Sequence, residues 1–224
     1  MDKIIIIGGG AAGIAAAIAA AECGKKAVIY EKNEKLGKKL YITGKGRCNV
    51  TNNCDMDQLF AGVVTNKRFL YSAFYGFTNT NIMELLEDAG CRLKTERGGR
   101  VFPVSDKSSD VISALSKRLR ALDVDIRLNE GVKELWLEEG ALKGVILERG
   151  AKKEAASAVI VATGGLSYPT TGSTGDGYRF AKEAGHSVTG TSPALVPFTT
   201  EETVGKDLQG LSLRNVEVVI RDGK

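Results

Sequence analysis

The chain has 224 residues, of which 43% are hydrophobic and 26% are charged, and its formal net charge is +4. This composition predicts a packed core, and the mild charge, without aromatic residues interleaved among basic ones, argues against a nucleic-acid partner. No apolar run is followed by a cleavage site or is long enough to cross a bilayer, which excludes a membrane protein. None of the four cysteines forms a C-x-x-C pair. We therefore expect a cytoplasmic protein with free thiols and no metal.

The first thirty residues predict a strand, a glycine turn, a helix and a second strand that ends on an acid. Isoleucines fill 4–7, the run G-G-G-A-A-G occupies 8–13, and a helix over 11–23 precedes a strand over 28–31. In a dinucleotide fold the glycines permit a tight turn, approach of a pyrophosphate, and close packing of helix on strand. The helix N-terminus offers N–H groups to phosphates, and Glu31 stands where a carboxylate binds ribose hydroxyls. The alternative is a buried βαβ unit whose glycines serve packing alone.

The segment 32–53 is predicted to be an irregular loop, and loops of this length are usually functional. It contains glycines and several basic residues, of which Lys39 and Arg47 can neutralise a pyrophosphate. Asn49 is a compact donor suited to carbonyl oxygens of a flavin or a substrate. A solvated basic loop is the alternative interpretation of the same residues.

Beyond this loop the pattern alternates between helices and strands. Four helices are predicted, over 69–77, 81–90, 109–122 and 175–184, and Ser109 is the predicted cap of the third. A hairpin or turn is predicted over 98–103, a meander over 132–147, and strands over 124–128 and 158–162. That last strand runs into Thr163-Gly164-Gly165, a second glycine site. Ligands bind at the carboxyl edge of parallel sheets, so both glycine turns are expected to meet one extended dinucleotide.

After His186 the alternation of predicted helices and strands stops. A strand is predicted over 211–220, and Asp222-Gly223 is a hairpin signal without a second strand after it. An isolated half-hairpin would expose an unpaired edge. We therefore expect the sequence to be a fragment, completed by a missing C-terminal segment or by a partner chain.

Two long motifs resemble one known family. The run T-G-K-G-R-C-N-V-T-N at 43–52 and the stretch from Ala162 to His186 are similar to the two signatures of the HI0933-like flavoproteins, also called the BaiN or YhiN family. The shorter runs at 99–103 and 192–197 match as well. The resemblance covers essentially the whole chain.

The resemblance implies an α/β fold: a Rossmann-like FAD-binding domain with a parallel sheet and a β-meander over 1–190, followed by the truncated start of a β-rich insert domain over 191–224. It implies that FAD is the cofactor and assigns each site residue a role. Gly8, Gly10, Ala12 and Gly13 would hold the pyrophosphate; Glu31 and Lys32 the adenosine ribose; Arg47, Cys48 and Asn49 would line the pyrophosphate–flavin region; Val132 would contact adenine through its backbone; and Thr163 and Gly164 would close over the cofactor.

The predicted function is that of an FAD-dependent oxidoreductase acting on a small organic substrate, with NAD(P)H as a candidate electron donor. No catalytic residue is assigned. Family members are longer than this chain, which leaves the activity of this portion open. Two alternatives are a flavin-binding module without catalysis and a Rossmann protein that binds NAD and needs no flavin.

Overall fold

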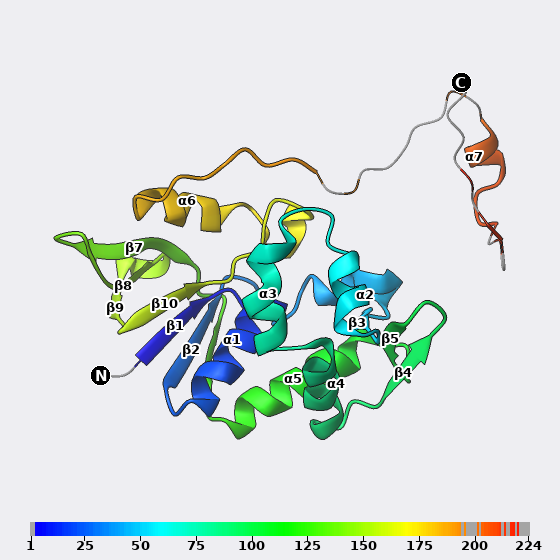
Figure 1. Cartoon of the computed structure of the whole chain (residues 1–224). Coiled ribbons are helices and arrows are strands. Elements are labelled where there is room, and N and C mark those ends of the chain that lie inside the picture. Colours follow the sequence, from blue (N-terminus) through cyan, green and yellow to red (C-terminus); the bar gives the residue numbers. More distant parts are fainter. Residues whose placement is uncertain are drawn as a thin grey trace. The chain divides into compact units, whose positions relative to one another are not determined.

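The computed structural model describes residues 3–193, 195, 201, 203–211, 213, 216, 217 and 219 (Figure 1). Its contacts divide the chain into a unit of residues 1–188 and a unit of residues 189–224. The helices are α1 (Ala11–Glu22), α2 (Met56–Ala61), α3 (Lys67–Gly76), α4 (Asn79–Asp88), α5 (Ser108–Ala121), α6 (Asp176–Glu183) and, in the second unit, α7 (Val204–Asp207). The strands are β1 (Lys3–Ile7), β2 (Lys26–Glu31), β3 (Thr51–Asn52), β4 (Leu93–Glu96), β5 (Arg100–Pro103), β6 (Asp125–Leu128), β7 (Val132–Glu138), β8 (Ala141–Leu147), β9 (Lys153–Ala155) and β10 (Ala158–Val161).

A four-stranded parallel sheet forms the centre of the first unit. Its strand order is β10-β1-β2-β6, and β1 pairs with both neighbours so that Ile6 lies opposite Ile160 and Ile29. The crossover from β1 to β2 runs through α1, as parallel strands require. The predicted Rossmann-type fold with a parallel sheet is therefore confirmed.

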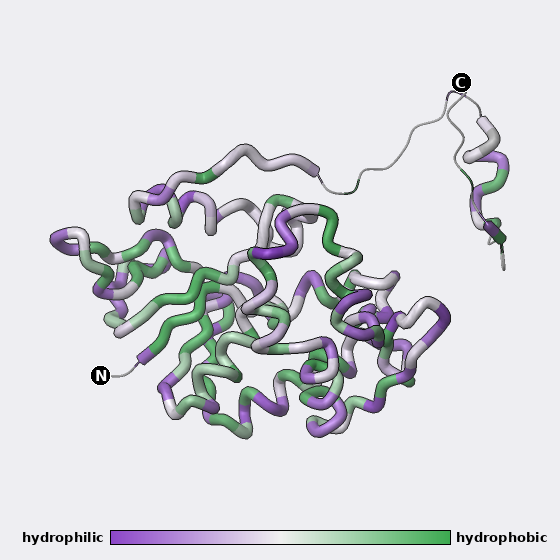
Figure 2. The backbone as a smooth tube through the Cα atoms, in the orientation of Figure 1, coloured by the Kyte–Doolittle hydropathy of each residue, from purple (hydrophilic) through white to green (hydrophobic). Residues whose placement is uncertain are grey.

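Both faces of the parallel sheet are covered. On one face, Ile6 and Ile29 belong to a core cluster shared with residues of α1, α4 and α5. On the other, Ile5 and Val28 pack with residues of the meander and with Phe180 of α6. β1 and β2 are thus apolar at successive positions, as expected of strands buried on both sides, and Figure 2 shows them as hydrophobic traces.

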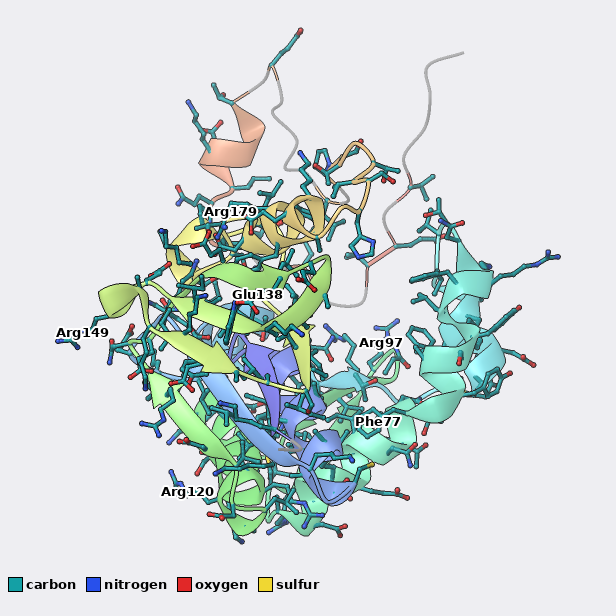
Figure 3. The ribbon with its side chains drawn as sticks, turned by 90° about the vertical axis from the view of Figure 1, so that its left-hand side faces the viewer. Phe77, Arg97, Arg120, Glu138, Arg149 and Arg179 are labelled. Atoms are coloured by element: carbon teal, nitrogen blue, oxygen red, sulfur yellow. The ribbon has the colours of Figure 1, made fainter. Side chains whose placement is uncertain are left out.

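Two antiparallel sheets accompany the parallel one. Strands β7, β8 and β9 form the meander, while β4 and β5 form a hairpin that β3 extends in the order β3-β5-β4. The meander and the turn predicted around 98–103 are both confirmed. Charged side chains gather at the outside of these layers, and Figure 3 shows Arg149 and Arg120 pointing away from the body of the protein.

Local signals explain where most helices begin and end. Helix α1 has Gly10 as its N-cap and Cys23 as its C-cap, and the next residue, Gly24, has a φ of 72°. Helix α4 begins with a capping box between Thr78 and Asn81. The prediction that Ser109 caps α5 is wrong, because the helix already begins at Ser108 and its N-cap, Lys107, makes no side-chain capping bond.

The second unit is described only in part. Helix α7 is its one assigned element among the described residues between 189 and 219. Five of the ten residues in the strand predicted over 211–220 lie outside the described residues, and so does the whole turn at Asp222-Gly223.

Candidate dinucleotide-binding site

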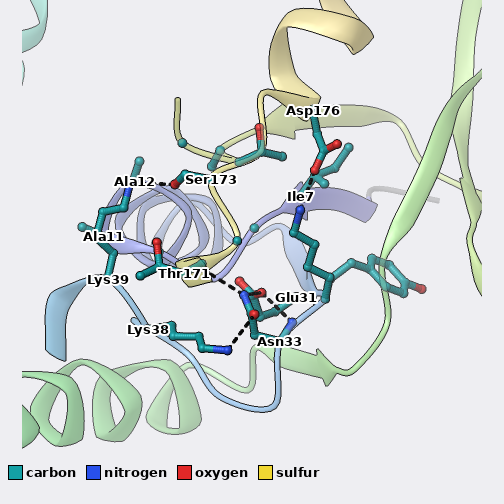
Figure 4. Close-up of a pocket in the computed structure, with 18 of the residues that line it drawn as sticks. Ile7, Ala11, Ala12, Glu31, Asn33, Lys38, Lys39, Thr171, Ser173 and Asp176 are labelled. Atoms are coloured by element: carbon teal, nitrogen blue, oxygen red, sulfur yellow. Dashed lines mark hydrogen bonds and ion pairs between the residues drawn. The ribbon is translucent and has the colours of Figure 1, made fainter. Parts of the chain in front are cut away.

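A cavity of about 240 Å³ lies at the carboxyl ends of β1, β2 and β10 (Figure 4). This is the edge at which parallel sheets bind ligands. Nine of the predicted site residues line it: Gly8, Gly10, Ala12, Glu31, Lys32, Lys39, Val132, Thr163 and Gly164. Residues from four distant parts of the sequence thus meet at one place.

The glycine turn between β1 and α1 forms one wall of the cavity. Gly8 has a φ of 105° and donates its N–H to the carbonyl of Tyr30 at 2.8 Å. A Cβ on Gly13 would overlap the carbonyl oxygen of Gly8, so this glycine joins helix to strand and does not itself line the cavity. At Gly10, by contrast, no atom lies within 4 Å of where a Cβ would stand. Because no side chain caps α1 there, its first N–H groups face an open space suited to a phosphate.

Glu31 ends β2 and holds its carboxylate at the cavity wall. The side chain is only 7% exposed. Its Oε2 accepts a hydrogen bond from the N–H of Gly9 at 2.7 Å, and its Oε1 accepts from the backbone N–H and the side-chain Nδ2 of Asn33 at 2.8 and 2.6 Å. A carboxylate offers about four acceptor positions, so three protein donors leave room for a further donor such as a ribose hydroxyl.

Two lysines bring positive charge to the cavity. Lys32 donates to Asp176 at 2.7 Å and to Thr174 at 2.8 Å. Burial opposes ionisation of Asp176, but the hydrogen bonds from Lys32 and Thr174 outweigh it and lower the pKa of that carboxyl. Lys39 donates to the carbonyl of Ser167 and to the hydroxyl of Ser173, both at 2.7 Å. Both acceptors of Lys39 are uncharged, so an anion in the cavity can still pair with its ammonium group.

The second glycine site and the meander complete the lining. The Oγ1 of Thr163 is buried and has no hydrogen-bond partner among the described residues. Such a group is costly unless a ligand or water satisfies it. Val132, at the start of β7, is 6% exposed and forms an apolar wall. The neighbouring Tyr30 is also buried, and this burial, together with nearby carboxylates, raises the pKa of its phenol to about 12. An open glycine turn, an orphaned hydroxyl and an apolar wall all fit a bound nucleotide.

Besides Gly13, three predicted residues are not brought to the cavity. Arg47 forms ion pairs with Glu96 and Asp106, and its guanidinium lies 4.0 Å from the centre of the Phe102 ring. The side chain of Cys48 is 2% exposed within the core beneath α1, and its burial raises the pKa of the thiol. Asn49, with its amide oriented to satisfy both atoms, donates to the carbonyls of Thr51 and Val101 at 3.0 and 3.2 Å. Contacts within the protein therefore account for the positions of these three side chains.

Other residues reach the site without having been predicted for it. Among them are Asn33 and Lys38 from the segment after β2, and Thr171, Gly172, Ser173 and Asp176 from the segment before and at the start of α6. The residues of the 165–176 segment are tied across the cavity by the side chains of Lys32, Asn33 and Lys39. In the sequence, only its position two residues after the predicted acid Glu31 could have indicated that Asn33 belongs to the site.

Two kinds of feature are absent from the described part of the chain. None of its side chains form a group of three or more histidine, cysteine or acidic residues that would hold a metal ion. No helix in the described ranges has both the length and the apolar character needed to cross a bilayer.

Comparisons with known proteins agree with this geometry. The model of the HI0933-like protein Rossmann domain matches residues 2–218. A 3-dehydro-bile acid delta(4,6)-reductase of Clostridium scindens is 34% identical over 99% of this chain and 55% of its own length. A ribosomal RNA dihydrouridine synthase of Escherichia coli is 30% identical over 93% of this chain and 50% of its own. The chain thus spans about half the length of these curated relatives. Among solved structures, a flavocytochrome c3 fumarate reductase in its open conformation has a TM-score of 0.55 and 25% identity, covering 82% of this chain and 40% of that one.

Proposed function

Because the chain belongs to the family of HI0933-like proteins with a Rossmann domain, we propose that it is part of an FAD-dependent oxidoreductase. The proposed substrate is a small organic molecule, and the proposed electron donor is NAD(P)H. The relative from Clostridium scindens, named as a reductase of a bile-acid derivative, supports this class of substrate.

One observation carries the proposal: residues predicted from two separate glycine motifs line a single cavity at the carboxyl edge of the sheet. The N-terminus of α1 and Lys39 would hold the pyrophosphate, Glu31 the adenosine ribose, and Val132 the adenine. These are contacts to the ADP moiety that FAD shares with NAD. Family membership supports FAD as the dinucleotide, and the likeness to a flavocytochrome supports it further.

When bound, FAD would supply the capacity to accept and pass on a hydride or single electrons. The residues of this chain would orient the cofactor and exclude water from its ADP end. The sequence contains one complete glycine fingerprint, at 8–13, so a nicotinamide donor is proposed to bind transiently and not as a second resident dinucleotide.

A second candidate substrate comes from the Escherichia coli relative, which is named for ribosomal RNA. Our prediction excludes nucleic acid, and the two substrate classes are separable by assay. A cytoplasmic location is also proposed, since all four cysteines are unpaired, as is usual in a reducing compartment.

The test begins with the visible absorption spectrum of the purified chain, before and after incubation with FAD and desalting. Retention of the flavin bands, and their bleaching by NADPH without oxygen, is the expected result. Substrates of both classes, a conjugated steroid ketone and an RNA transcript, are then offered to the reduced protein, and faster reoxidation identifies the accepted class. A colourless protein that takes up NAD but not FAD would overturn the proposal.

A further inference from the structure

We propose that Asn33 is a positioning residue that fixes the Glu31 carboxylate in the orientation needed to bind the adenosine ribose. The inference rests on the proposed dinucleotide function. Asn33 follows β2 by two residues and supplies two of the three hydrogen bonds that Glu31 accepts (Figure 4).

The carboxylate of Glu31 is held from both sides. The N–H of Gly9, in the glycine turn, donates to Oε2, while Asn33 donates twice to Oε1. Since each oxygen is held by a different segment, the plane of the carboxylate cannot rotate without losing a hydrogen bond. A ribose hydroxyl therefore meets an acceptor whose orientation is set before binding, which lowers the entropy lost on association.

The amide of Asn33 is itself held in one orientation. Its Oδ1 accepts from the ammonium of Lys38 at 3.2 Å, which leaves Nδ2 directed to Glu31 at 2.6 Å. The choice of oxygen and nitrogen follows from these partners, because the reverse orientation would set an NH₂ group against an ammonium. Lys38 thus holds the Asn33 amide, which in turn holds Glu31.

Asn33 also links Glu31 to the segment across the cavity. Its Nδ2 donates to the carbonyl of Thr171 at 3.3 Å, and a Cβ on Gly172 would come within 2.6 Å of the same nitrogen. Gly172 has a φ of 99°, a conformation that favours glycine. The close approach of this segment leaves the amide little space for another arrangement.

Binding of ADP and of 2′-deoxy-ADP to the full chain tests the inference by calorimetry. In the wild type, loss of the 2′-hydroxyl is expected to weaken binding about tenfold, the value of one hydrogen bond to a charged group. Asn33→Ala is expected to weaken ADP binding and to shrink the ratio between the two ligands toward unity. The double variant with Asn33→Ala and Glu31→Ala is expected to show the same ratio of ADP to 2′-deoxy-ADP affinity as Glu31→Ala alone.

Two further variants keep the experiment decisive. Asn53→Ala removes an amide that bonds Thr95 on the surface, and it should change neither affinity nor ratio. Asn33→Asp keeps the shape of the side chain but sets a second carboxylate beside Glu31, so it should shrink the ratio even where Asn33→Ala fails to fold. A folded variant that weakens both ligands equally would show that Asn33 only supports the structure and would overturn the inference. A wild type that binds neither nucleotide would overturn the proposed function, and the inference with it.

Discussion

Replacing Glu31 by glutamine changes one oxygen of a buried carboxylate into an NH₂ group and leaves the volume almost unchanged. If the NH₂ group replaces Oε1 it faces two donors from Asn33, and if it replaces Oε2 it faces the N–H of Gly9. The better arrangement still leaves the N–H of Gly9 without an acceptor. A buried donor in this state costs about 1–3 kcal/mol.

The same substitution acts on ligand binding. A hydrogen bond from a ribose hydroxyl to a carboxylate is worth roughly 1.5–3 kcal/mol, against about 1 kcal/mol for a neutral acceptor. Glu31→Gln should therefore weaken ADP or FAD binding by about threefold to thirtyfold. Without ligand, its unfolding temperature should fall by roughly 2–10 °C for a chain of this size.

Titration calorimetry with ADP and thermal unfolding followed by circular dichroism measure the two effects of Glu31→Gln. Glu22→Gln is the matched control, because the Glu22 side chain is 43% exposed, pairs with Arg118, and lies at the end of α1 away from the cavity. A folded Glu31→Gln protein with the nucleotide affinity of the wild type would refute the assignment of Glu31 to the ribose. An unchanged unfolding temperature would refute the account of the buried donor.

Three other substitutions test neighbouring parts of the site. Gly13→Ala should prevent folding or abolish nucleotide binding, because the added methyl group overlaps the glycine turn before α1. Gly76→Ala is its control: the methyl group there meets no atom within 4 Å, so solubility and unfolding temperature should stay near those of the wild type. Lys39→Met should lower ADP affinity about threefold to tenfold and make that affinity less dependent on salt concentration. If calorimetry finds the same salt dependence in the variant and the wild type, Lys39 does not contact a phosphate. Asp176→Asn should lower stability at neutral pH, since the pKa of Asp176 is lowered in the folded state, chiefly by Lys32 acting against burial. The stabilisation is fully present above the unfolded pKa of about 3.9 and is lost as the pH falls through the folded value. Urea unfolding should therefore show a larger difference between wild type and variant at about pH 7 than at about pH 3.

The parts of the fold that could be predicted from sequence depend on signals close together in the chain. The run at 4–13 shows a strand, a turn and a helix start within ten residues, and the structure has all three. The location of Arg47 could not be predicted in this way. Its partners Glu96, on β4, and Asp106, between β5 and α5, lie 49 and 59 residues further along, and their packing against the loop has no local signature.

Contacts across the cavity were hidden for the same reason. Asn33 stands next to the predicted acid, but its partner Thr171 is 138 residues away. The resemblance implied FAD as the cofactor and singled out eight of the nine predicted residues that line the cavity. It did not distinguish residues that face a ligand from those, such as Cys48, that are buried beneath it.

The two-sided burial of β1 has a consequence for how the chain finds its register. Because Ile5 and Ile6 are both fully buried, on opposite faces, hydrophobicity alone does not tell one face of the strand from the other. The close packing of Gly13 against Gly8 does, since a side chain at residue 13 would overlap the Gly8 carbonyl oxygen and α1 can therefore approach the strand this closely only at a glycine. The turn that would receive the phosphates is therefore also a folding signal, and selection for a different ligand cannot reshape it without risking the alignment of the whole sheet.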